Sequence, residues 1–159
     1  KTVTTIEAKK ILLVEDDPDM RDILSFWLSG EGYAVTGAAN GWEAIQTARA
    51  EPFDAVVLDL LMPGVDGFQT CRYMRHDAAL RNLPVIMFSA VFIDEEERRL
   101  GIEVGADEFV PKTSGFQSLI AAVNRAINRN GDGPVRPPID EAIAAQVRAE
   151  IEAASKTGA

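Results

Sequence analysis

Five polar residues of this chain stand directly at or after the ends of short apolar segments, and their side chains differ in chemistry. They comprise three carboxylates, a hydroxyl and an ammonium: Glu15, Asp16, Asp59, Ser89 and Lys112. Carboxylates that converge repel one another and need a cation, and oxygen ligands with room for water suit Mg²⁺ or Mn²⁺. A carboxylate can also attack phosphorus, and the transferred group then needs positive charge and hydrogen-bond donors. The set therefore predicts a metal-assisted phosphoryl-transfer site.

The segments that must position these residues alternate between two patterns. Short apolar runs predict buried strands at residues 10–14, 33–36, 55–58, 85–88 and 108–110. Amphipathic repeats predict helices from Pro18 to Gly30 and over residues 41–50, 67–75, 95–104 and 116–129. This alternation predicts an α/β, doubly wound, flavodoxin-like fold with a five-stranded parallel sheet and helices on both faces. Ligands of such sheets bind outside the carboxyl ends of the strands, where the five polar residues stand.

The C-terminal part follows a different pattern. Residues 130–138 are rich in glycine and proline and lack periodicity, which predicts a linker. Apolar residues then recur every four positions at Ile139, Ile143, Val147 and Ile151, which predicts an amphipathic helix over residues 139–155. This helix either packs back on its own domain or serves as a dimer seam or a connector. The predicted division is an extension at 1–9, a domain at 10–129, the linker, the helix and a tail at 156–159.

The composition argues against two classes of function. The chain has 159 residues, 25 of them acidic and 16 basic, and a formal net charge of -9, which opposes direct binding to nucleic acid. Every apolar run is shorter than the roughly 20 residues that span a bilayer, so no membrane association is expected. The single cysteine, Cys71, cannot form an internal disulfide, and the first residues show no charged-then-apolar pattern, so we expect no signal peptide. We therefore expect a cytoplasmic protein.

Four motifs surround the five polar residues: residues 11–17 (ILLVEDD), 58–67 (LDLLMPGVDG), 88–90 (FSA) and 105–112 (GADEFVPK). They resemble those of response-regulator receiver domains of two-component signal transduction, and the resemblance covers residues 10–129. It implies a signalling domain that accepts a phosphoryl group from a histidine kinase or a histidine phosphotransfer protein. Such a domain catalyses only its own phosphorylation and dephosphorylation and is otherwise not an enzyme.

The resemblance also implies a role for each site residue. Asp59 is the phosphoacceptor, and it coordinates the metal together with Asp16 and the backbone carbonyl of Leu61, while Glu15 acts through a water. Ser89 hydrogen-bonds one phosphoryl oxygen and Lys112 pairs with another.

Phe109 is the aromatic residue that turns inward on activation. It couples the site to the surface formed by the fourth helix, the fifth strand and the fifth helix, including residues 94–115. The predicted C-terminal helix, as a connector or a dimer seam, adds an output domain outside this chain and a homodimer as further expected partners.

The chain departs from the family pattern in two places. Thr113 follows Lys112, where the family commonly has a proline in a cis bond. Leu61 and Val91 are aliphatic at the two positions that flank the approach of a hydrolytic water. Because neither side chain can orient a water, we expect slow self-dephosphorylation.

Two other classes of protein share part of this pattern. A phosphatase or mutase of the haloacid dehalogenase type also phosphorylates an aspartate at a strand end, but it needs a second aspartate two residues later. That position is Leu61 here. A pseudo-receiver that only mediates contacts would not need Asp59, Asp16 and Lys112 together. Incorporation of phosphate from acetyl phosphate would distinguish the receiver from the pseudo-receiver.

Overall fold

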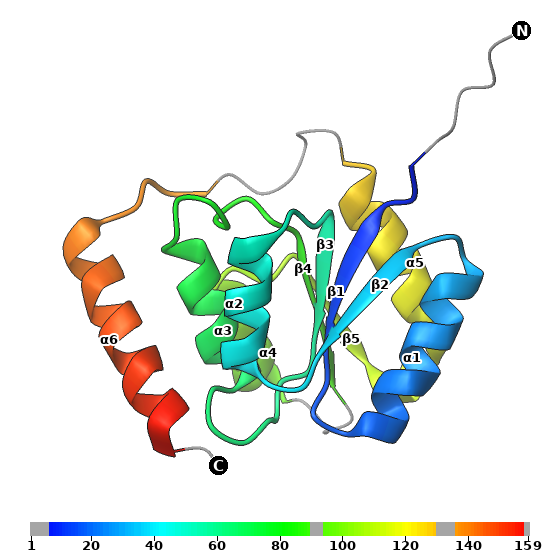
Figure 1. The fold of residues 1–159 in the computed structure, drawn as a ribbon, viewed down its shortest axis with the longest axis horizontal. Coiled ribbons are helices and arrows are strands. Elements are labelled where there is room, and N and C mark those ends of the chain that lie inside the picture. Colours follow the sequence, from blue (N-terminus) through cyan, green and yellow to red (C-terminus); the bar gives the residue numbers. More distant parts are fainter. Residues whose placement is uncertain (1–6, 90–93, 130–135, 158–159) are drawn as a thin grey trace, which may run out of the picture.

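The computed structural model describes residues 7–89, 94–129 and 136–157, and five of its segments form one parallel sheet (Figure 1). The strands are β1 (Lys10–Val14), β2 (Ala34–Ala38), β3 (Ala55–Leu58), β4 (Val85–Ser89) and β5 (Glu108–Pro111). Their order across the sheet is β2-β1-β3-β4-β5. This order reverses between β1 and β3, which confirms the predicted doubly wound fold and places the functional crevice at the carboxyl ends of these two strands.

The second strand differs from its predicted range of residues 33–36. Tyr33 donates its amide to the Leu28 carbonyl (3.3 Å), so it belongs to the turn that closes the preceding helix. Ala34 is the first residue that pairs with β1, and the pairing continues as far as Ala38 opposite Val14. The strand is therefore shifted towards the C-terminus because hydrogen bonding to β1, rather than apolar character, sets its limits.

Five helices cover the two faces of the sheet. They are α1 (Pro18–Gly30), α2 (Gly41–Ala50), α3 (Gly67–Arg75), α4 (Glu95–Glu103) and α5 (Phe116–Ile127). Each of the first four begins after a polar N-cap whose side chain accepts an amide of the first turn: Asp17, Asn40, Asp66 and Asp94. Helices α1 and α5 lie on one face, and α2, α3 and α4 lie on the other (Figure 1).

The side chains of each strand divide between two cores. Ile11 and Leu13 of β1 are buried against α1 and α5, whereas Leu12 and Val14 are buried on the α2 and α3 side. All four are at most 1% exposed, and burying one such side chain contributes about 1.5–3 kcal/mol. Because the three central strands β1, β3 and β4 are buried on both faces, only the residues at their ends are free to be polar.

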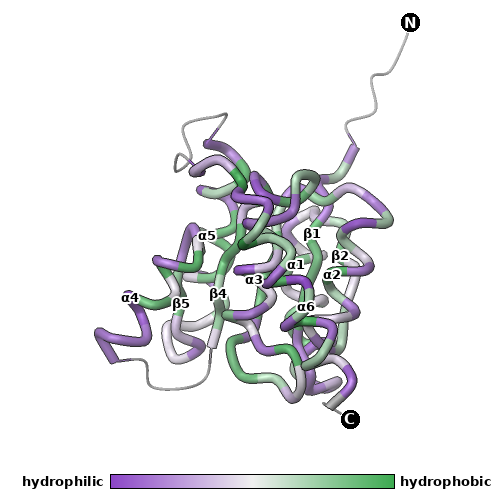
Figure 2. The backbone as a smooth tube through the Cα atoms, turned by 90° about the vertical axis from the view of Figure 1, so that its left-hand side faces the viewer, coloured by the Kyte–Doolittle hydropathy of each residue, from purple (hydrophilic) through white to green (hydrophobic). Residues whose placement is uncertain are grey.

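A sixth helix, α6 (Glu141–Thr157), runs along α3 (Figures 1 and 2). It begins two residues later than expected, because the Asp140 carboxylate accepts the amides of Ala142 (2.9 Å) and Ile143 (3.3 Å) as a cap. Its buried residues are Ala144, Val147 and Ile151, and Ile143 is 40% exposed, so the predicted stripe is partly wrong. A spacing of four residues drifts by about 40° per step around a helix, so Ile143 leaves the buried face.

None of the helices in the described ranges is long and apolar enough to cross a membrane.

Candidate functional site

The end of β1 and the end of β3 bring two predicted carboxylates side by side. Val14 pairs with Leu58, so the residues that follow them, Glu15 and Asp59, are level across the sheet. Both are held by backbone bonds beyond the strands: the Asp59 amide donates to the Val14 carbonyl (3.0 Å) and the Glu15 amide to the Ala38 carbonyl (3.0 Å). The two carboxylates are therefore fixed by the sheet rather than by a loose loop.

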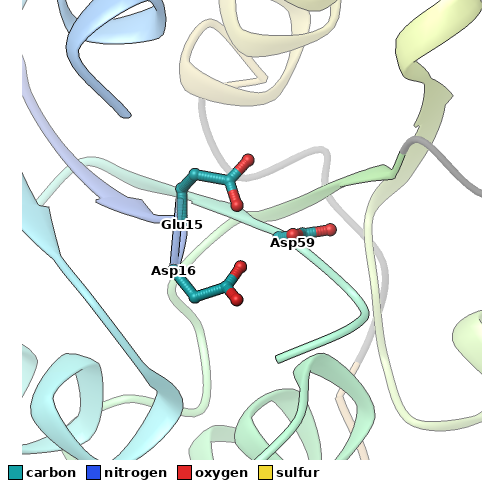
Figure 3. Close-up of side chains that lie close together, drawn as sticks. All are labelled: Glu15, Asp16 and Asp59. Atoms are coloured by element: carbon teal, nitrogen blue, oxygen red, sulfur yellow. The ribbon is translucent and has the colours of Figure 1, made fainter. Parts of the chain in front are cut away.

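Asp16 joins these two residues in an acidic cluster, which we define as Glu15, Asp16 and Asp59 (Figure 3). One carboxylate oxygen from each lies within 4.8 Å of those of the other two. Glu15 and Asp59 are 2% and 8% exposed, whereas Asp16 is exposed. The cluster therefore has a buried base and one side that faces solvent.

Lys112 brings an ammonium to this cluster from the short 3₁₀ helix η1 (Lys112–Ser114) after β5. Its Nζ lies 2.5 Å from Glu15 Oε1 and 3.8 Å from Asp59 Oδ2. The peptide bond between Lys112 and Thr113 is trans. Within the described residues, Lys112 is the one cation that forms an ion pair with these carboxylates, so three acidic groups face one ammonium.

The electrostatics of the cluster favour the addition of positive charge. Burial raises the pKa of Glu15 above its ordinary value; the nearby Lys112 opposes this shift and Asp59 adds to it. Burial also raises the pKa of Asp16, and the neighbouring Glu15 adds to that shift. Both directions mean that the ionised carboxylates are destabilised in this arrangement. Since a bound cation would stabilise the ionised forms, the residues fit a hard divalent ion such as Mg²⁺.

The loop between β3 and α3 is held close to the phosphoacceptor candidate. The Gly67 amide donates to the Leu60 carbonyl (2.9 Å), and a Cβ at Gly67 would lie 2.4 Å from the Asp59 carbonyl oxygen. Only glycine permits this approach. Leu61, whose carbonyl is the predicted fourth ligand, lies in this loop with a side chain that is 59% exposed.

The two remaining predicted site residues lie on β4 and β5. Ser89 is the last residue of β4, is fully buried and pairs with Pro111, which directly precedes Lys112. Phe109 is partly buried against α4, since a Cβ at Gly101 would lie 3.0 Å from its ring. Val91 lies outside the described residues. The structure thus places Glu15, Asp16, Asp59 and Lys112 together and Ser89 on the neighbouring strand.

Sequence reasoning missed a second ionic cluster, which we call the Asp107 cluster: Asp107 with Arg75, Arg129 and Arg136. The Asp107 side chain is 3% exposed, and its carboxylate accepts from Arg75 (3.0 Å), Arg129 (3.4 Å) and Arg136 (2.7 Å). It also accepts the Val85 amide at 2.8 Å. The arginines are scattered along the sequence without a common spacing, so no local pattern marks them. The only signal was an aspartate preceding a strand.

A comparison with protein families identifies the class of this domain. The model of the response regulator receiver domain matches residues 11–124. The chain therefore belongs to the family of response regulator receiver domains, which are signalling domains of two-component systems. This confirms the resemblance that the motifs indicated.

Individual relatives place the same domain in several kinds of protein. The DNA-binding response regulator MtrA of Mycolicibacterium smegmatis is 36% identical over 126 residues, which cover 79% of this chain and 54% of that protein. This chain thus spans about half the length of that curated relative.

Two solved structures show the likeness of the fold. Chemotaxis protein CheY4 of Vibrio cholerae matches 76% of this chain and 99% of its own with a TM-score of 0.71 and 28% identity. The signal receiver domain of a signal transduction histidine kinase from Syntrophus aciditrophicus matches 84% of this chain and 100% of its own, with a TM-score of 0.72 and 29% identity. Membership of the family therefore defines the domain but not the output to which it is coupled.

Proposed function

We propose that Asp59 accepts a phosphoryl group from the phosphohistidine of a histidine kinase or a histidine phosphotransfer protein. The observation that supports this proposal is the convergence of three carboxylates and one ammonium at the carboxyl ends of β1 and β3. Glu15, Asp16, Asp59 and the Leu61 carbonyl would hold Mg²⁺ or Mn²⁺. When bound, the cation supplies the positive charge that offsets the carboxylates and the oxygens of the incoming group.

The residues of the chain have distinct tasks in this transfer. An Asp59 carboxylate oxygen attacks phosphorus, the bond between phosphorus and the histidine nitrogen breaks, and an acyl phosphate forms on Asp59. Lys112, already 3.8 Å from Asp59 Oδ2, would exchange its contact with Glu15 for one phosphoryl oxygen. The Ser89 hydroxyl would donate to another. Both interactions are stronger with the phosphorylated form, because that form carries more negative charge and more acceptor oxygens.

The movement of Ser89 and Phe109 would transmit the signal. Ser89 ends β4, and Phe109 lies on β5 against Gly101 of α4, so a shift of the β4 end changes the space available to the ring. The surface formed by α4, β5 and α5 would then change its shape and bind a target, a second copy of this chain or an output domain outside it. In this division, residues 10–129 are the phosphoaccepting domain and 130–138 a linker. The helix predicted at 139–155, which packs on α3 as α6, would serve as a connector or dimer element only where it leaves this face.

Family membership and net charge indicate the kind of partner that this chain binds. A receiver domain acts on protein partners. The relative MtrA is described as DNA-binding, but the net charge of -9 argues that this chain does not itself bind DNA. We propose a cytoplasmic location, where histidine kinases expose their phosphohistidine.

Mass spectrometry of the intact chain after incubation with acetyl phosphate and MgCl₂ tests this function. We expect one phosphoryl group on the parent chain and none on Asp59→Asn, because an amide of the same shape cannot attack phosphorus. Circular dichroism of both proteins is the control for folding. Incorporation into Asp59→Asn at the parental rate would overturn the assignment of Asp59, and no incorporation into the parent would favour a domain that only mediates contacts.

A further inference from the structure

Helix α6 completes a third apolar core that is separate from the two cores of the sheet. Val147 and Ile151 of α6 are buried with Ile45 of α2, Tyr73 of α3 and Val65 of the β3–α3 loop. All five side chains are at most 4% exposed. Most of the stability of a helix in a protein comes from packing of its apolar face, so the order of α6 depends on this contact. The α2–α3 face is thus an interaction surface that α6 already occupies.

The N-terminal end of α6 is tied to the amino edge of the sheet. Arg136, five residues before the helix, donates to the Gly105 carbonyl (3.2 Å) and pairs with Asp107 (2.7 Å). Arg81 in turn donates to the carbonyls of Arg136 (3.1 Å) and Pro137 (2.6 Å). The approach to the helix is therefore fixed by the Asp107 cluster.

The C-terminal end of α6 reaches the opposite edge, beside the acidic cluster. Ser155 lines a hollow of about 330 Å³ together with Asp16, Gly64 and Val65. The red end of α6 accordingly lies near the loop that follows β3 (Figure 1). Together with the segment before it, α6 thus spans the domain from the α4–β5 turn to the loop that carries the predicted metal ligand Leu61.

Val65 is the contact through which α6 reaches the site. It is 2% exposed and lies between α6 and the start of α2, where a Cβ at Gly41 would lie 2.6 Å from the Val65 carbonyl oxygen. The loop around it is short and held at both ends, by Asp59 at the end of β3 and by the Asp66 capping box of α3. A change in the position of Val65 would therefore also move the loop that carries Leu61 and follows Asp59.

We propose that α6 is an intramolecular ligand of the α2–α3 face whose docking is coupled to cation binding at Glu15, Asp16 and Asp59. This inference rests on the metal site of the proposed function. Docked α6 holds Val65 and with it the loop in one arrangement, so the Leu61 carbonyl is in place before the cation arrives. Coupling between two sites is reciprocal, so the cation strengthens docking of α6 to the same degree that α6 strengthens cation binding.

Calorimetric titration with MgCl₂ of the full chain and of two matched variants tests the first direction. Val147→Asp places a charge in the α6 core, whereas Ile143→Asp makes a similar change one turn earlier at an exposed position. We expect the dissociation constant for Mg²⁺ to rise about fivefold in Val147→Asp, which is the weak end of ordinary coupling, and to stay unchanged in Ile143→Asp. Equal Mg²⁺ affinity in all three proteins, with α6 shown by hydrogen exchange to be released in Val147→Asp, would overturn the coupling.

Hydrogen exchange of the unmutated chain tests the reverse direction without any risk of misfolding. MgCl₂, compared with KCl at equal ionic strength, should slow exchange of the α6 amides and leave those of α5 on the other face unchanged. In Asp16→Ala the slowing should disappear. If Mg²⁺ binds by calorimetry but α6 exchange is unaffected, the coupling is wrong and the metal site stands. If Mg²⁺ does not bind the parent chain at all, the metal site itself is wrong and the coupling falls with it.

Discussion

Two clusters of charged residues lie at opposite ends of the strands of the sheet, and their charges are balanced in opposite ways. At the carboxyl edge, Glu15, Asp16 and Asp59 share the Lys112 ammonium. At the amino edge, the Asp107 carboxylate accepts from three guanidinium groups of Arg75, Arg129 and Arg136. The first cluster has too little positive charge among the described residues. The second has three guanidinium groups around one carboxylate, although Arg129 is shared with Glu108 (2.8 Å).

The surplus donors of the Asp107 cluster have protein acceptors. Arg75 donates to the carbonyls of Gly105 (2.8 Å), Leu83 (2.8 Å) and Arg81 (3.2 Å) as well as to Asp107. These bonds join the end of α3 to the turns before β4 and β5, so the cluster stabilises the fold. The acidic cluster has no comparable set of donors among the described residues. Buried charged groups whose partners belong to the chain itself thus have a structural role. Buried charged groups that the chain leaves without enough opposite charge indicate a site for a ligand.

Removal of Asp107 should have the largest effect on stability. Asp107→Ala leaves buried guanidinium groups without their carboxylate, and breaking a buried pair in this way costs about 3–5 kcal/mol. We expect the free energy of unfolding, measured by urea denaturation, to fall by that amount. A fall of less than about 0.5 kcal/mol, the usual range for surface substitutions, would contradict the structural role of the Asp107 cluster, because both clusters would then be dispensable for folding.

The matching change in the acidic cluster should affect binding rather than stability. Asp16→Ala removes a ligand carboxylate and relieves repulsion with Glu15, so we expect loss of Mg²⁺ binding by calorimetry. In the absence of Mg²⁺, the free energy of unfolding should change by less than about 0.5 kcal/mol. If Mg²⁺ binds as well as to the parent chain, Asp16 is not a ligand.

The lifetime of the acyl phosphate on Asp59 tests the functional role of the acidic cluster. Leu61→Asn combined with Val91→Glu would supply polar groups able to orient a water beside the phosphoryl oxygens. We expect loss of phosphate to accelerate by about a hundredfold, the lower end of what a positioned polar group contributes. Release of labelled phosphate from purified phosphoprotein with Mg²⁺ and without kinase measures this rate. An unchanged rate would mean that aliphatic side chains at these positions do not set the lifetime.

The smallest expected effect on folding and function concerns the Cys71 thiol, which lies beside the Asp107 cluster. Burial raises the pKa of Cys71 to about 11, with Arg75 and Arg136 opposing the shift and Asp107 adding to it. The folded protein should therefore keep the thiol neutral at pH 8 and react with a disulfide reagent far more slowly than the urea-unfolded chain does. Reaction of both states at the same rate would show that the region around Asp107 opens readily.

The two clusters also differ in how far the sequence predicted them. Glu15, Asp16, Asp59 and Lys112 each stand at or near the end of a strand, and a parallel sheet collects its carboxyl ends on one edge, so their meeting followed from local pattern alone. The Asp107 cluster joins the end of α3, the residue before β5, the segment after α5 and the segment before α6. Those pieces have no fixed spacing in the sequence, and only their packing brings them together.

The sequence by itself determined the parallel sheet, its five helices and the edge that carries the chemistry. It did so because burial on both faces makes strands apolar and amphipathic helices periodic, and these are short-range patterns. The tertiary structure alone decided that Lys112 lies closer to Glu15 than to Asp59 and that β2 runs to Ala38. It also decided which residues of α6 face the domain: Ala144, Val147 and Ile151 do, and Ile143 does not. Each of these depends on which surfaces of distant segments meet, and docking geometry is not encoded in the spacing of residues along one segment.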